Sequence, residues 1–315
     1  VSISSNNTVN TLAKVGDAIT VTFTSSEEIQ DPPTATIGGT SATVSGSGTS
    51  WSATRTLTSS DANGVIAFAI DFLDLASNAG TQVTSSTDGS TVTLDQTPPT
   101  LTAVAISSSN SYDNSLARVG DVLTISFTTD ETIQAPTVAV DGSSATVTGS
   151  GSSWSASFTM GATNTEGSVT FTIDYMDLVG NIGTQGTSTT DGSGITFDRT
   201  LPTLSSIVIE SDNFYDVSLA KIGDDVELSF VSSESIQTPT VTIGGASATV
   251  TGSNTSWLAS RAMTSSDNEG SIIFEISYMD PSGNIGIEGT ATTDASSITF
   301  DRTAPTMSAI AIASN

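Results

Sequence analysis

Val119-Gly120-Asp121-Val122-Leu123-Thr124-Ile125-Ser126-Phe127 is a Gly-Asp turn followed by a segment in which apolar and polar residues alternate. Alternation with a period of two predicts a β-strand with one buried face. The same turn, again followed by an alternating segment, occurs at Val15-Gly16-Asp17 and at Ile222-Gly223-Asp224. The chain therefore contains the same predicted unit three times.

Other landmarks recur in the same order around this turn. Trp51, Trp154 and Trp257 are equally spaced, and the period of about 100 residues is the size of a small independent β domain. The repeat predicts domains at 1–96, 97–199 and 200–302, with 303–315 as the first strand of a fourth. Val1-Ser2-Ile3-Ser4 aligns with Val104-Ala105-Ile106-Ser107, so we expect the first strand of the first domain to be incomplete.

Each unit is predicted to be an antiparallel β-sandwich with almost no helix. The middle unit contains about seven short alternating segments separated by turn residues, which is typical of this class. We expect residues 168–174 to form one strand. The tryptophans and the phenylalanines are expected in the core because they recur at equivalent strand positions (Phe23, Phe127 and Phe230; Phe68, Phe171 and Phe274).

Composition excludes several functions. The 315-residue chain has no Cys and no His, so Cys-ligated metal, thiol chemistry and histidine acid–base catalysis are excluded. It has 33 acidic and 7 basic residues, for a net charge of −26. Nucleic acid and anionic membrane surfaces are therefore not expected partners, because phosphate contacts need Lys and Arg. No apolar run approaches the roughly 20 residues that span a bilayer, so direct membrane insertion is not expected either.

Three phrases resemble bacterial immunoglobulin-like repeats: the Val-Gly-Asp turn, Tyr175-Met176-Asp177-Leu178-Val179-Gly180-Asn181, and Asp198-x-Thr-x-Pro202. Such repeats build large surface adhesins and some cell-surface layers. The resemblance implies three tandem immunoglobulin-like Greek-key β-sandwich domains in an elongated array, located outside the cell. It also implies Ca²⁺ at or near the junctions between domains.

An immunoglobulin-like topology predicts where the carboxylates meet. The loop after the second strand and the loop before the last strand share the end at which the chain enters, so the linker from the preceding domain should reach both. Oxygen-only ligands favour Ca²⁺, Mg²⁺ or Mn²⁺. The predicted metal ligands are Asp95, Glu131, Asp177 and Asn181 at the first junction, and Asp198, Glu234, Asp280 and Asn284 at the second. Glu27, Asp74 and Asn78 would await a preceding linker, and Asp301 would serve a following domain.

Turn chemistry is the alternative explanation for these residues. The Asp of Asp-x-Thr-x-Pro can cap a turn, Asn181 beside Gly180 can occupy a turn position, and Glu131 can be a solvated loop charge. Lys14, Arg118 and Lys221 each precede a Gly-Asp turn. Their recurrence in a chain with few basic residues predicts a salt bridge to a linker carboxylate.

The sequence favours a non-enzymatic structural segment of an extracellular surface protein, a calcium-stiffened tandem rod that extends or assembles an adhesin. Its expected partners are neighbouring repeats of the same protein. The alternative is a self-assembling subunit of a surface layer, sheath or filament, in which residues 307–313 exchange strands between identical chains. Glycan binding is a third hypothesis, disfavoured because the aromatic residues recur at predicted core positions. Catalysis is not expected, because carboxylates repeated at domain ends make a poor active cleft.

Overall fold

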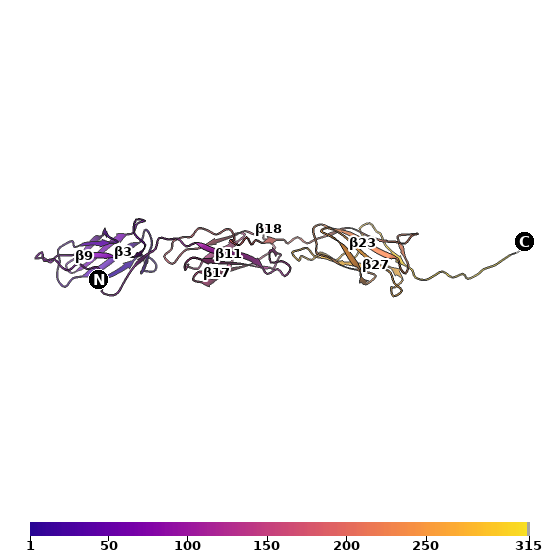
Figure 1. The fold of residues 1–315 in the computed structure, drawn as a ribbon, viewed down its shortest axis with the longest axis horizontal. Helices are drawn as coiled ribbons and strands as arrows, with labels where there is room; N and C mark the ends of the chain where they lie inside the picture. The colour runs from indigo at the N-terminus through magenta and orange to yellow at the C-terminus, as the bar shows by residue number, and fades with distance from the viewer. Residues whose placement is uncertain (314–315) are drawn as a thin grey trace. The chain divides into compact units, whose positions relative to one another are not determined.

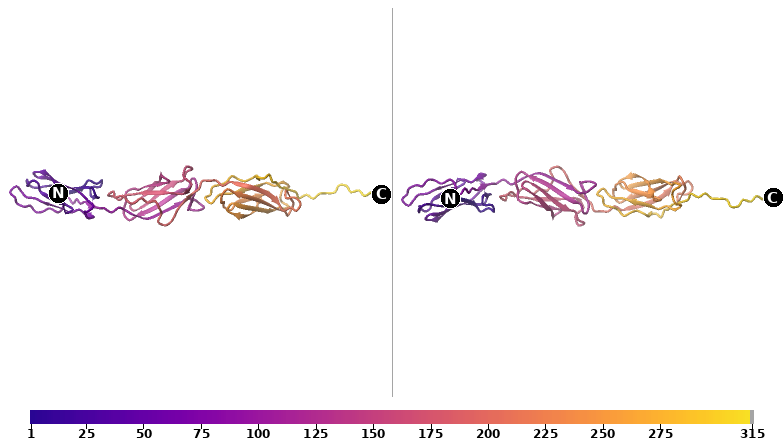
Figure 2. Two further views of the ribbon diagram at one scale, coloured as in Figure 1. Left: turned by 90° about the horizontal axis from the view of Figure 1, so that it is seen from above. Right: turned by 90° about the horizontal axis from the view of Figure 1, so that it is seen from below.

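The computed structural model describes residues 1–313, and every regular element in that range is a β-strand (Figure 1). Figure 2 shows the same strands from two further directions. The prediction of an all-β chain with three β-sandwich domains is confirmed. Residues 1–313 include no helix long and apolar enough to cross a membrane.

The first repeat has a four-stranded sheet on one side of its core and two three-stranded sheets on the other. The four-stranded sheet has the order β1-β3-β7-β6, from Ser2–Ser5, Ala18–Thr24, Ser50–Thr56 and Thr43–Ser47. One three-stranded sheet is β5-β4-β9, from Thr40–Ser41, Thr34–Ile37 and Phe68–Asp71. The other is β2-β10-β8, from Leu12–Ala13, Thr93–Leu94 and Gly64–Val65, in which β10 is parallel to β2.

The third repeat has the same plan. Its four-stranded sheet is β21-β23-β27-β26, from Leu204–Ser211, Asp225–Ser232, Ser256–Ala262 and Thr249–Ser253. Its three-stranded sheets are β25-β24-β29, from Ala246–Ser247, Thr240–Ile243 and Phe274–Ser277, and β22-β30-β28, from Leu219–Ala220, Thr299–Phe300 and Gly270–Ser271.

The chain divides into two compact units, and the boundary runs through the middle repeat. The first unit contains residues 1–105, 125–157 and 170–192, and the second contains 106–124, 158–169 and the chain from 193 onward. Three strands of the middle repeat have residues in both units: β11 (Leu101–Ser108), β13 (Val122–Thr129) and β17 (Ser153–Thr159).

The other strands of the middle repeat each lie in one unit. The first unit holds β14 (Thr137–Val140), β15 (Ser143–Ser144), β16 (Thr146–Ser150) and β19 (Phe171–Asp174). The second holds β12 (Leu116–Ala117), β18 (Gly167–Ser168) and β20 (Thr196–Phe197).

Alternation along the strands builds the core. In β3 every second residue is buried, and the buried side of this strand packs against the two short sheets of the same repeat. The six phenylalanines predicted in the core are all at most 8% exposed, which confirms that prediction. Trp51 and Trp257 are buried as well, whereas Trp154 is half-buried.

Two segments differ from the prediction. Residues 168–174 do not form one strand, because β18 pairs with β20 and β19 pairs with β14, so the chain changes sheets at Val169–Thr170. The alternating pattern continues through the change because both segments face the same core. Residues 303–313 form no strand and are exposed, and residues 314–315 lie outside the described range. The domain limits drawn from the repeat stay predictions.

Candidate metal centres

Asp95, Glu131 and Asp177 come together from three separate parts of the first unit. Asp95 follows β10, Glu131 follows β13, and Asp177 follows β19. One carboxylate oxygen from each residue lies within 4.8 Å of the other two. The structure thus places side by side the three carboxylates that the sequence assigned to the first junction. We call them the first cluster.

Asp177 is the most buried member of the first cluster. It is 1% exposed, and its Oδ1 accepts hydrogen bonds from the backbone N–H groups of Val179 (2.9 Å), Gly180 (2.7 Å) and Asn181 (2.8 Å). Several N–H groups thus converge on one carboxylate oxygen. The loop therefore holds this buried carboxylate in a fixed position.

Asn181 ties the linker to this loop. Its amide nitrogen donates to Asp177 Oδ2 at 2.7 Å and to the Asp95 carbonyl at 3.1 Å. Gln134 adds a bond that sequence reasoning missed, because its Nε2 donates to the Asp177 carbonyl at 2.9 Å. Gln recurs at this place in the three repeats, as Gln30, Gln134 and Gln237, and that recurrence was the available signal for this role.

The second unit contains the equivalent cluster. Carboxylate oxygens of Asp198, Glu234 and Asp280 lie within 4.8 Å of one another, and Asp280 is fully buried. Asn284 donates to Asp280 Oδ2 at 2.7 Å and to the Asp198 carbonyl at 3.1 Å. Gln237 donates to the Asp280 carbonyl at 3.0 Å. The same geometry arises twice from different neighbouring residues, so the shared loop sequences determine it. We call this carboxylate triad the second cluster.

Electrostatics disfavour three charged carboxylates in either cluster without a cation. Burial, and then the charges of the neighbouring aspartates, raise the pKa of Glu131 and of Glu234. Burial is also the largest cause of the raised pKa of Asp198, and Asp280 adds to it. No ion pair of the described residues brings a Lys or Arg to either cluster.

One cluster atom lacks any hydrogen-bond partner. Glu234 Oε1 is buried and accepts no hydrogen bond from the residues the structure describes. A buried carboxylate oxygen without a donor costs about 1–3 kcal/mol or more, and a bound cation would remove that cost. The residues present fit a hard divalent cation, since all the side-chain donors are oxygen atoms and Ca²⁺ takes six to eight such ligands.

The remaining predicted ligands form no three-carboxylate group within residues 1–313. Glu27, Asp74 and Asn78 line one pocket of about 340 Å³ in the first repeat. There Asn78 donates to Asp74 Oδ2 at 2.7 Å, and that side-chain bond is the largest cause of the lowered pKa of Asp74. Asp301 accepts the Thr303 N–H at 2.8 Å, as a turn cap does.

The predicted salt bridges to linker carboxylates are wrong. Lys14 Nζ donates to the Gly180 carbonyl at 2.7 Å, and Arg118 Nη1 donates to the Gly283 carbonyl. Lys221 instead pairs with Asp224 of its own turn at 2.5 Å. Lys14 bonds to a carbonyl because Asp177 accepts the backbone N–H groups of the loop, which leaves the carbonyls of the loop available to a basic side chain.

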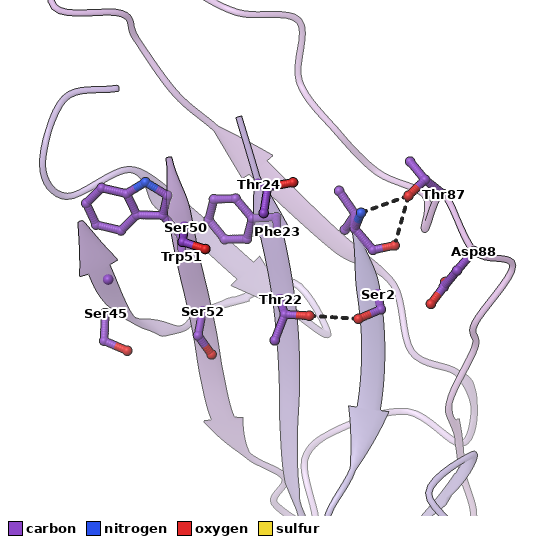
Figure 3. A pocket seen from close by; sticks show the side chains of 12 residues that line it. Ser2, Thr22, Phe23, Thr24, Ser45, Ser50, Trp51, Ser52, Thr87 and Asp88 are labelled. Atoms are coloured by element: carbon purple, nitrogen blue, oxygen red, sulfur yellow. Dashed lines mark hydrogen bonds between the residues drawn. The ribbon is translucent and has the colours of Figure 1, made fainter. Parts of the chain in front are cut away.

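A groove of about 520 Å³ lies on the four-stranded sheet of the first repeat (Figure 3). Ser2, Thr22 and Ser52 line its floor, and Ser2 and Thr22 share a 2.7 Å hydrogen bond. The aromatic residues at its edge, Phe23 and Trp51, are 7% and 4% exposed. A sugar ring would therefore find hydroxyl groups there but little aromatic surface for stacking.

No protein-family model matches the chain, and no curated protein matches its sequence. Among solved structures, fibronectin(III)-like modules of CbhA from Clostridium thermocellum match with 14% identity and a TM-score of 0.30, over 62% of this chain and 94% of that one. SGBP-B of the mixed-linkage glucan utilization locus of Bacteroides ovatus, in complex with a mixed-linkage heptasaccharide, matches with 14% identity and a TM-score of 0.20, over 92% of this chain and 66% of that one. These similarities concern the fold alone.

Proposed function

We propose that this chain is a non-enzymatic structural segment of an extracellular surface protein. In this proposal a Ca²⁺ ion at each carboxylate cluster fixes the angle between one β-sandwich domain and the next. The observation that carries the proposal is the twofold recurrence of a partly buried carboxylate triad built from a linker and two loops of the following repeat.

Each cluster has ligands from both sides of a junction. Asp95 belongs to the linker that leaves the first repeat, whereas Glu131 and Asp177 belong to loops of the middle repeat. A cation that binds all three would cross-link the linker to the next domain. Flexible linkers otherwise let tandem domains swing, so the cation would convert a hinge into a fixed joint.

Ca²⁺ suits the clusters better than the other hard cations. It tolerates irregular geometry and accepts carbonyl and water ligands alongside carboxylates, whereas Mg²⁺ demands a near-ideal octahedron. Glu131 and Glu234 each lie in a loop, so their long side chains can adjust to the Ca²⁺–oxygen distance, which is longer than that of Mg²⁺. Asp177 and Asp280 would supply the fixed part of each site.

The composition supports a structural role. The chain has neither Cys nor His, and its strongly acidic surface gives solubility in a saline medium. Assembly of identical chains into a layer or filament stays a separate hypothesis.

Titration calorimetry with Ca²⁺ tests the proposal. We expect one strong binding event per carboxylate cluster in the wild-type chain, and the loss of one of them in Asp198→Ala. Asp301→Ala is the matched control, because Asp301 caps the same kind of turn but has no neighbouring carboxylate triad. Absence of Ca²⁺ binding, or equal loss in both variants, would disprove the assignment.

A further inference from the structure

A second contact links consecutive repeats within each unit, and none of its hydrogen bonds is made by a cluster carboxylate. In the first unit Asn7 Nδ2 donates to the Val179 carbonyl at 3.0 Å, next to the Lys14–Gly180 bond. In the second unit Asn110 Nδ2 donates to the Ser282 carbonyl at 2.8 Å, next to the Arg118–Gly283 bond. In both units the side chain of an Asn and the side chain of a Lys or Arg donate to two consecutive backbone carbonyls.

We propose that the Asn and the basic residue (Asn7 with Lys14, Asn110 with Arg118) form a latch. The latch recognises the Asp-x-x-Gly-Asn loop of the following domain and holds the two domains in register without a metal ion. The partner surface of the latch is the pair of adjacent carbonyls before the Asn of that loop.

The loop is built to offer those carbonyls. In Asp177-Leu178-Val179-Gly180-Asn181 the N–H groups of the last three residues bond to Asp177 Oδ1, so the peptide units are held with their N–H sides on the carboxylate. Their carbonyls are then available on the other side of the loop. Gly180 and Gly283 have φ of 92° and 86°, a left-handed conformation that glycine adopts without strain.

Glycine also makes room for the close approach of the neighbouring repeat. A Cβ on Gly180 would lie 2.9 Å from Lys14 Nζ, and a Cβ on Gly283 would lie 2.4 Å from the Tyr112 ring. The first repeat carries Ser77 at the equivalent position of its own loop, with φ of 68°. The latch thus distinguishes loops with glycine at this position from loops with a larger residue.

Hydrogen bonds within its own repeat orient the side chain of the latch Asn. Asn110 Oδ1 accepts the N–H groups of Tyr112 (2.9 Å) and Asp113 (3.3 Å), and its Nδ2 donates to Asp121 Oδ2 at 2.8 Å. These bonds fix the amide and leave one N–H directed at Ser282. Pre-organisation of this kind lowers the entropy lost on binding.

The third repeat has the same pair without a partner loop in the described chain. Asn213 makes the same internal bonds, to Asp224 Oδ2 at 2.7 Å and from the Tyr215 N–H at 3.1 Å. Lys221 folds back onto Asp224, and the neighbouring Phe214 and Tyr215 are 91% and 92% exposed. Tyr215 occupies the position at which Tyr112 covers Gly283. The Asn of the third repeat thus keeps the same internal bonds, whereas Lys221 pairs with Asp224 of its own turn.

Distance measurements between spin labels test the latch. The chain has no Cys, so Thr54→Cys and Thr137→Cys place one label on each side of the first junction at exposed strand positions. In excess chelator, we expect a narrow distance distribution for the otherwise wild-type chain. Combining Asn7→Ala with Lys14→Met should broaden it, with about a tenfold rise in undocked conformers, as expected for a lost charged hydrogen bond.

Two further variants separate recognition from general damage. Lys14→Arg should keep the narrow distribution, because Arg118 makes the same contact at the next junction. Lys221→Met should leave it unchanged. A distribution in chelator that is equally broad with and without the latch residues would overturn the proposal. Because chelator removes Ca²⁺ from every sample, this result is independent of whether the carboxylate clusters bind it.

Discussion

Glu234→Gln should change the stability of the third repeat in opposite directions with and without Ca²⁺. Glu234 lies within 4.8 Å of two aspartate oxygens, and at an effective dielectric constant of about 20 each such pair repels by about 3 kcal/mol. Salt screening and loop relaxation reduce the total to about 1–2 kcal/mol. Glutamine keeps the shape of the side chain and removes its charge, so in chelator the variant should be more stable than the wild type.

Calcium should reverse this order. A ligand at a hundred times its dissociation constant stabilises the folded state by about 2.7 kcal/mol, and a site without Glu234 would gain much less. Scanning calorimetry of both chains, each in chelator and in excess Ca²⁺, measures the four transitions. For a domain of this size, 1 kcal/mol corresponds to at least about 4 °C in the melting temperature.

Glu288→Gln is the matched control, because it removes one exposed negative charge outside the clusters. It should shift the melting temperature by a similar small amount in both buffers. Two results would refute this role of Glu234: a lower melting temperature for Glu234→Gln than for the wild type in chelator, or an equal rise in the melting temperature of both chains on addition of Ca²⁺. The first result would mean that the Glu234 charge does not destabilise the cluster, and the second that Glu234 does not contribute to Ca²⁺ binding.

Three further predictions follow from the same contacts. In chelator, the pKa values of Glu131 and Glu234 are raised above the ordinary 4.5, so the folded chain binds protons more tightly than the unfolded chain. The melting temperature should therefore rise as pH falls from 7 to about 5. This rise should be smaller in a chain that carries both Glu131→Gln and Glu234→Gln. Asp61→Ala should lower the free energy of unfolding by about 3–5 kcal/mol in denaturant titrations, because it leaves Arg55, only 10% exposed, without its charged partner. The double variant Arg55→Phe, Asp61→Asn should lower it much less, because the middle repeat carries Phe158 and Asn164 at the equivalent positions. Asp280→Ala should destabilise the third repeat even in chelator, by about 2–4 kcal/mol in the same assay, because its buried carboxylate accepts the Asn284 N–H at 2.8 Å and the Asn284 amide at 2.7 Å.

The sequence by itself determined the fold class, because alternation and turn residues are local properties. The Gly-Asp turn and the alternating residues after it are enough to predict β3, β13 and β23, and equal spacing is enough to predict three copies. A change of sheet within one alternating segment left no local mark, so residues 168–174 were predicted as one strand although they form parts of two.

Only the tertiary structure decided how the polar groups pair. The sequence named the carboxylates that would meet, because it assigned them to loops at one end of a known topology. It could not show that Asp177 binds the N–H groups of its own loop, which depends on backbone direction in a turn. That turn leaves carbonyls as the acceptors for Lys14 and Arg118, and a carbonyl has no signature in the sequence because every residue has one.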